Sequence, residues 1–109
     1  MRKLQTGDLF SFARVIKASG IREELVNYLQ TINQESDKEK VGMTTVLMII
    51  EALSDKKAEK AFYDALNPVF EEDVERMTPA ELFANLKKLS EENDLTNFFS
   101  SVFGTLGKS

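Results

Sequence analysis

Acidic side chains are the main candidates for chemistry in this chain of 109 residues, because it contains no histidine and no cysteine. Without these two residue types, the usual acyl-transfer triads and almost all zinc and other transition-metal sites are excluded. Disulfides are excluded for the same reason. Any catalysis would therefore have to use carboxylates, lysines, or the hydroxyl groups of serine, threonine and tyrosine.

The densest group of carboxylates lies at residues 71–75, where four of the five side chains are acidic. A site for a hard cation needs oxygen ligands at defined spacing, often with a glycine in the turn, as in the EF-hand loop. Neither this group nor residues 91–94 has that spacing, so we interpret both as solvated acids at helix ends and predict no metal site. None of the glycines belongs to a dinucleotide- or phosphate-binding pattern, so no cofactor is expected.

Glu51 is the one acid whose neighbours in the sequence are mostly apolar. A carboxyl group in an apolar pocket has a raised pKa and can act as a general acid or base. A position on a solvent-facing helix surface, or a pairing with a lysine, explains Glu51 more simply. We therefore predict no catalytic residue and no enzyme, and only a deep polar pocket around Glu51 would change that.

The longest apolar stretch, residues 41–53, is expected to form a helix at the centre of the fold. A helix that is apolar on more than one face is normally buried among several neighbours. Its β-branched residues leave a strand as the alternative, but strict alternation is absent and no second strand candidate offers a partner. The stretch is also too short to cross a bilayer. Its main apolar stripe consists of Met43, Val46, Leu47, Ile50 and Leu53.

Further amphipathic helices are expected at about residues 7–19, 21–32, 56–66, 79–92 and from residue 95 onward. The clearest end signal is a capping box formed by Thr78 and Glu81, with Pro79 at the first helical position. Gly20 suits a left-handed helix end, and Pro68 is expected to end the helix that precedes it. The prediction is an all-α, compact bundle of five or six short helices around a central apolar helix, in one domain covering residues 1–109, with residues 104–109 frayed.

The net charge of −4 is unevenly distributed along the chain. Residues 1–22 are basic, and the remainder is strongly acidic. Such asymmetry can mean a basic docking face, attraction between copies, or ordinary solvated helix surface. The basic patch is smaller than the footprint that nucleic-acid binding usually leaves, so no nucleic-acid partner is expected. The basic side chains are Arg2, Lys3, Arg14, Lys17 and Arg22, with Asp8 as the only acid among them.

The aromatic residues suggest a partner-binding surface near the C-terminal end. The adjacent Phe98 and Phe99 point about 100° apart on a helix and cannot both enter one narrow groove. Either one seals the bundle and a loop covers the other, or the last helix offers an apolar strip to a partner helix or to another copy. On the second interpretation, Phe99→Asp should preserve the helical signal and weaken binding. The predicted partner-binding residues are Leu95, Phe98, Phe99, Val102 and Phe103, with Phe10 and the basic N-terminal face second.

Taken as a string, the sequence resembles the small tail assembly chaperones of long-tailed bacteriophages and prophages, particularly those that infect Gram-positive bacteria. The resemblance is suggested by the opening from Met1 to Leu25, with Thr6, Asp8 and Phe10 among its matching positions. The central apolar helix, the run of residues 57–60 and the tail of residues 91–102 fit the same pattern. Together these parts span nearly the whole chain.

The resemblance implies a non-enzymatic role in viral morphogenesis. Such proteins are thought to bind and solubilise the long, helical tape measure protein and to help recruit tail tube subunits, and they leave before the tail is complete. It also implies self-association, since many weak copies along one rod would bind by multivalency. The family often makes a longer form by ribosomal slippage, and residues 106–108 could be encoded by a slippery heptamer, which the gene sequence would test.

Neither a signal peptide nor a transmembrane span is visible in the sequence. We therefore expect a cytoplasmic protein without a membrane partner, located in the host cytoplasm if the resemblance holds. The alternative function is a small helical regulatory adaptor or DNA-associated protein that uses the basic residues 1–22. Binding to duplex DNA that falls steeply with salt would favour this alternative.

Overall fold

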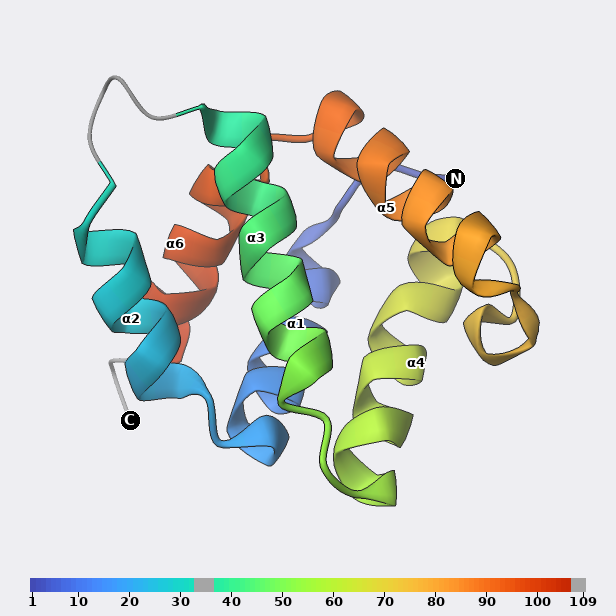
Figure 1. The fold of residues 1–109 in the computed structure, drawn as a ribbon, viewed down its shortest axis with the longest axis horizontal. Coiled ribbons are helices and arrows are strands. Elements are labelled where there is room, and N and C mark those ends of the chain that lie inside the picture. Colours follow the sequence, from blue (N-terminus) through green and yellow to red (C-terminus); the bar gives the residue numbers. More distant parts are fainter. Residues whose placement is uncertain (33–36, 107–109) are drawn as a thin grey trace.

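The computed structural model describes residues 1–32 and 37–106, and over these residues the fold is all-α, as the apolar spacing predicts. The described chain contains six α-helices and one short 3-10 helix, and no strand. Figure 1 shows the helices as a compact bundle. In chain order they are α1 (Thr6–Ser19), α2 (Arg22–Gln30), α3 (Lys38–Glu51), α4 (Lys56–Phe70), the 3-10 helix η1 (Val74–Arg76), α5 (Pro79–Glu92) and α6 (Leu95–Leu106).

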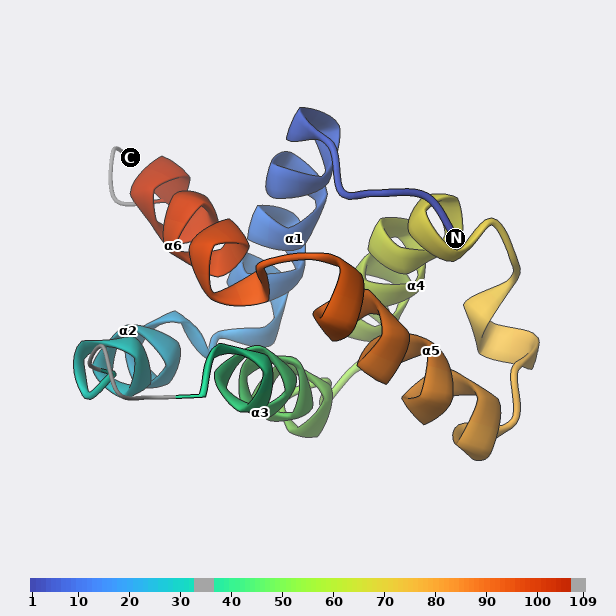
Figure 2. The ribbon, with the colours of Figure 1, turned by 90° about the horizontal axis from the view of Figure 1, so that it is seen from above.

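The helix with the widest set of neighbours is α1, which packs against α2, α3, α4 and α6. Figure 2 shows α1 between α4 and α6, with α2 and α3 along one side. Because α1 is covered from several directions, Val15 and Ile16 are both fully buried although they point to different sides of the helix. The predicted central helix, α3, packs against α1, α5 and α6.

The α3 helix is confirmed, but it buries a different face from the predicted stripe. Of that stripe only Val46 is buried, and Leu47 lies on the surface with 36% of its area exposed. Thr45 takes an inward position instead, where its hydroxyl donates a hydrogen bond to the Val41 carbonyl at 2.9 Å. This bond satisfies the buried hydroxyl, so a polar residue occupies the core face at little cost. A search for apolar spacing alone cannot find such a position.

The α4 helix continues through Pro68 to Phe70, so the predicted end at Leu66 is wrong. Pro68 lies in the last turn, where its missing N–H removes one helical hydrogen bond. Val69 and Phe70 lie beyond it and are buried, and their burial stabilises this turn. The helix ends instead at Glu71, which adopts the left-handed conformation at φ 59°.

Two of the other predicted end signals are confirmed. Thr78 Oγ1 accepts from the Glu81 N–H at 3.2 Å, which forms the predicted capping box. Gly20 is left-handed, with φ 72°, at the end of α1. Of the polar connector at residues 33–40, residues 33–36 lie outside the described residues, and residues 38–40 belong to α3. The last helix, α6, includes Gly104, where fraying was expected, and continues to Leu106.

Gly42 allows α3 and α6 to approach each other closely. It is buried, and a Cβ atom placed on it would lie 2.7 Å from the Cβ of Leu95, the first residue of α6. Cβ atoms do not approach one another this closely, so only a glycine fits this crossing. Gly42, which interrupts the apolar stretch of α3, therefore sets the distance between α3 and α6.

Candidate functional site

The predicted C-terminal strip is largely part of the core. Leu95, Phe99 and Val102 are at most 3% exposed, so the expectation that they present an open surface is wrong for this fold. The physical reason is an aromatic cluster with α1, in which Phe12 packs edge-on against Phe98 and Phe99, with ring centroids 5.4 and 5.8 Å apart. We therefore now expect Phe99→Asp to unfold the chain, because it would bury a charge without a partner.

The remaining predicted contact residues are accessible to different degrees. Phe98 and Phe103 are partly exposed, and both pack against the core. Phe10 projects from α1 with 51% of its area exposed, the largest value for any large apolar side chain in the described chain. Only Phe10 therefore offers the open apolar surface that the sequence analysis assigned to the whole set.

A second apolar surface, which the sequence analysis missed, lies between α3 and α5. Met43 and Phe83 line a groove there, and its other lining residues are two acids and two bases, Asp37, Glu39, Lys40 and Lys87. Phe83 is 45% exposed, and the exposed Leu47 follows Met43 by one turn of α3. We call Met43, Leu47 and Phe83 the α3–α5 surface.

The signal for this surface was present in the sequence at Leu82 and Phe83. Adjacent residues on a helix point about 100° apart, so a helix that is covered on one side only buries one of them more deeply than the other. In the structure, Leu86 and Leu89 are buried and Leu82 packs partly against the core, which leaves Phe83 turned outward.

The acidic residues form no enclosed site in the described chain. Glu51 is exposed and lines an open depression with Glu24, Met48 and the helix corner at Gly20. An exposed carboxylate lacks the apolar enclosure expected of a general acid or base. Among residues 1–32 and 37–106, no three acidic side chains lie close enough together to hold a metal ion. Over the same ranges, no helix is long and apolar enough to cross a membrane.

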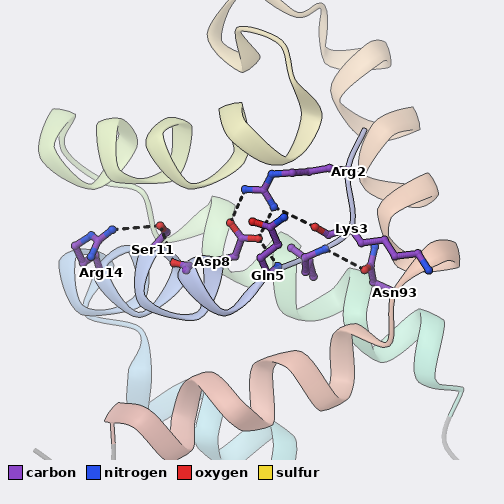
Figure 3. Close-up of polar contacts among 9 residues, drawn as sticks. Arg2, Lys3, Gln5, Asp8, Ser11, Arg14 and Asn93 are labelled. Atoms are coloured by element: carbon purple, nitrogen blue, oxygen red, sulfur yellow. Dashed lines mark hydrogen bonds and ion pairs between the residues drawn. The ribbon is translucent and has the colours of Figure 1, made fainter.

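The basic N-terminal segment is partly used for folding. Residues 1–5 form an extended segment, here called the N-terminal strap, which crosses from α1 to α4 (Figure 3). The Arg2 N–H donates to the Val69 carbonyl at 2.8 Å, and the Leu4 N–H donates to Asn93 Oδ1 at 3.3 Å. The Arg2 guanidinium makes two hydrogen bonds to Asp8, at 2.8 and 3.0 Å. Arg2 is therefore largely withdrawn from any basic docking face.

Asp8 is buried, with 4% of its area exposed. Burial alone would raise the pKa of its carboxyl group. The hydrogen bonds from Arg2 and from the Gln5 N–H, together with the positive charge of Arg2, outweigh burial, so the pKa lies below its ordinary value. Asp8 is thus ionised in the folded chain at neutral pH and acts as the anchor of the strap. The sequence shows Asp8 only as a helix-start acid, and nothing in the spacing identifies Arg2 as its partner.

Comparison of this chain with protein families, curated proteins and solved structures finds no match. The function therefore has to be argued from the surface itself and from the resemblance noted in the sequence. The candidate surfaces are the α3–α5 surface, Phe10 on α1, and the exposed basic residues near Phe10.

Proposed function

We propose that this chain is a non-enzymatic tail assembly chaperone of a long-tailed bacteriophage or prophage, which binds and solubilises a tape measure protein and helps to recruit tail tube subunits. Two findings support the proposal: the resemblance along most of the sequence, and the helical fold with an apolar surface left uncovered. The single observation that carries it is the α3–α5 surface, where Leu47 and Phe83 are 36% and 45% exposed.

The chemistry of the α3–α5 surface suits an amphipathic helix as the bound segment. Phe83 supplies a large, rigid apolar contact, and Met43 is flexible enough to adapt to different side chains. Lys40 and Lys87 line the same groove and can keep their charged ends in water while their stems cover apolar area. This arrangement fits the helix-in-groove mode of recognition. Each contact would be weak, and many copies along a rod-shaped client would bind through multivalency.

The experiment is co-expression of the chain with a helical fragment of the tape measure protein that the proposal assigns as its client. We expect the fragment to remain in solution and to co-purify with the wild-type chain. The double variant Leu47→Asp/Phe83→Asp should lose co-purification, because two charges would oppose burial of the surface. Its free energy of unfolding should change by no more than about 1 kcal/mol, since both side chains are substantially exposed.

The matched control is Ala84→Asp/Ser100→Asp, which adds the same two charges at exposed positions on α5 and α6. This control should bind the fragment as the wild type does. The proposal is wrong if the wild-type chain fails to hold the fragment in solution. It is also wrong in its choice of surface if the control and the double variant lose binding equally.

A further inference from the structure

A second groove, between α1 and α4, differs from the α3–α5 surface in its charge. Ala61 and Ala65 are the apolar residues that line it, and Ala65 is almost fully buried, so they form its floor. The polar lining residues come from both helices and include three cations. They are Ser11 and Arg14 on α1, and Lys57, Lys60 and Asp64 on α4.

Two of the three cations in the groove have no anionic partner in the described chain. Lys60 pairs with Asp64 at 2.9 Å within α4. Arg14 donates a hydrogen bond to Ser11 Oγ at 3.2 Å, which leaves its charge uncompensated (Figure 3). Over the described ranges, neither Arg14 nor Lys57 has a carboxylate within ion-pair distance. The lining of this groove is thus net positive, although the protein carries a net charge of −4.

Exposed side chains on α1 extend the groove. Phe10 lies one helical turn before Arg14 on the same side of α1, and it is 51% exposed. Lys17 lies further along the same side and is also exposed. The surface therefore combines a row of cations with one large apolar side chain. This combination complements a segment that carries carboxylates beside an apolar residue.

We propose that the groove between α1 and α4 binds an acidic, amphipathic helical segment of another protein, with its carboxylates at Arg14 and Lys57 and an apolar side chain against Phe10. The groove, at about 160 Å³, admits a side chain and is smaller than the pockets that hold small-molecule ligands. Two unpaired cations are too few for the repeated phosphate contacts of nucleic-acid binding. This proposal is independent of the tape measure client, since Leu47 and Phe83 lie on other helices.

The test uses a fluorescein-labelled helical peptide of about 18 residues, long enough to hold helical structure, with glutamates at i, i+4 spacing beside one leucine. Anisotropy should show binding to the full chain at low salt, and this binding should weaken at high salt because the contacts are exposed. The same peptide with every glutamate replaced by glutamine should not bind. Arg14→Glu/Lys57→Glu should bind the acidic peptide about tenfold more weakly or worse.

The matched control is Arg22→Glu/Lys88→Glu, which makes the same change in net charge at exposed positions on α2 and α5. Binding by this control should stay within about twofold of the wild type. Equal loss in the two variants, or binding of the glutamine peptide, would overturn the proposal. A labelled DNA duplex is the remaining comparison. If it binds more tightly than the peptide, and the groove variant loses this DNA binding, the groove is assigned to nucleic acid instead.

A second copy of the chain is the other occupant to distinguish. Sedimentation measures self-association of the wild type, the groove variant and the control variant without peptide. It distinguishes a second copy in the groove from another protein there. Self-association that disappears only in Arg14→Glu/Lys57→Glu would assign the groove to another copy and overturn the proposal. Self-association that is unchanged in all three proteins, together with the loss of peptide binding in the groove variant, is the result expected. Circular dichroism should show the same helical content for all three.

Discussion

At the scale of single residues, Asp8 has the clearest structural role. It is the only charged side chain among the buried residues of the described chain, and its carboxylate accepts hydrogen bonds from Arg2 and from the Gln5 N–H. These bonds hold the N-terminal strap against α1 while the strap also contacts α4. A buried ion pair is strongly disrupted when one partner loses its charge, because the other then remains without compensation.

We predict that Asp8→Asn lowers the free energy of unfolding by about 2 kcal/mol at neutral pH, since it removes charged hydrogen bonds from a buried site. Denaturant unfolding followed by circular dichroism measures this change. Asp64→Asn is the control, because it breaks the exposed pair with Lys60 and should cost no more than about 0.5 kcal/mol. Equal effects of the two substitutions would contradict the structural role of Asp8.

The same pair predicts a dependence on pH with a definite sign. The pKa of Asp8 in the folded chain is lowered from 3.8, so the stability that the pair contributes is fully present above that value. It is lost as the pH falls through the lower, folded-state pKa. The difference in stability between the wild type and Asp8→Asn should therefore be constant from about pH 5 to pH 7 and shrink below about pH 4. A difference that stays constant down to pH 2 would contradict this assignment.

At the scale of elements, the crossing of α3 and α6 depends on Gly42. The nearest atom to a Cβ at this position is the Cβ of Leu95, which cannot move away by rotation of the side chain. Gly42→Ala would therefore push the two helices apart, although alanine is the better helix former. We predict a loss of about 1–3 kcal/mol in the free energy of unfolding, which is typical of overpacking.

Gly104→Ala is the matched control for this prediction. Gly104 also lies in a helix, but a Cβ there would meet no atom within 4 Å. The substitution should therefore stabilise α6 by up to about 1 kcal/mol, through helix propensity alone. Thermal and denaturant unfolding of the two variants should move in opposite directions. A stabilised Gly42→Ala would contradict the close approach of α3 and α6 at this position.

At the scale of the whole molecule, burial is concentrated around α1 and is slight at α2. Leu25 is the only buried residue of α2, whereas α1 and α4 each contribute several. Local stability follows buried apolar contacts, so the bundle should open first at α2. Native-state hydrogen exchange should show amides in α2 exchanging at least about tenfold faster than amides in the middle of α1. Equal protection in the two helices would mean that the bundle opens only as a whole.

Sequence patterns predicted the helices well, because each signal is local. The capping box at Thr78 and the left-handed Gly20 are set by residues within one turn, and both are confirmed. The predicted end of α4 at Leu66 was wrong, because burial of Val69 and Phe70 stabilises a turn that Pro68 weakens. Packing between helices decides such cases, and local spacing does not contain that information.

Prediction of the candidate surfaces was weaker for the same reason. Periodicity shows that Leu47, Phe83 and Phe99 each belong to an apolar side of a helix, but it does not show which side meets a neighbour. The structure buries Phe99 against Phe12 and leaves Leu47 and Phe83 uncovered. The groove between α1 and α4 was also inaccessible to sequence reasoning, because Arg14 and Lys57 are far apart along the chain and are brought together only by packing.

The N-terminal strap has a consequence for the order of events during synthesis. Its partners Val69 and Asn93 leave the ribosome long after residues 1–5 do. Until then Arg2 can pair with Asp8, but the strap lacks the groups on Val69 and Asn93 to which it hydrogen-bonds. Residues 1–5 are thus fixed only after partners that are translated much later, so a nascent chain halted before Asn93 should leave residues 1–5 open to a protease that the finished fold resists.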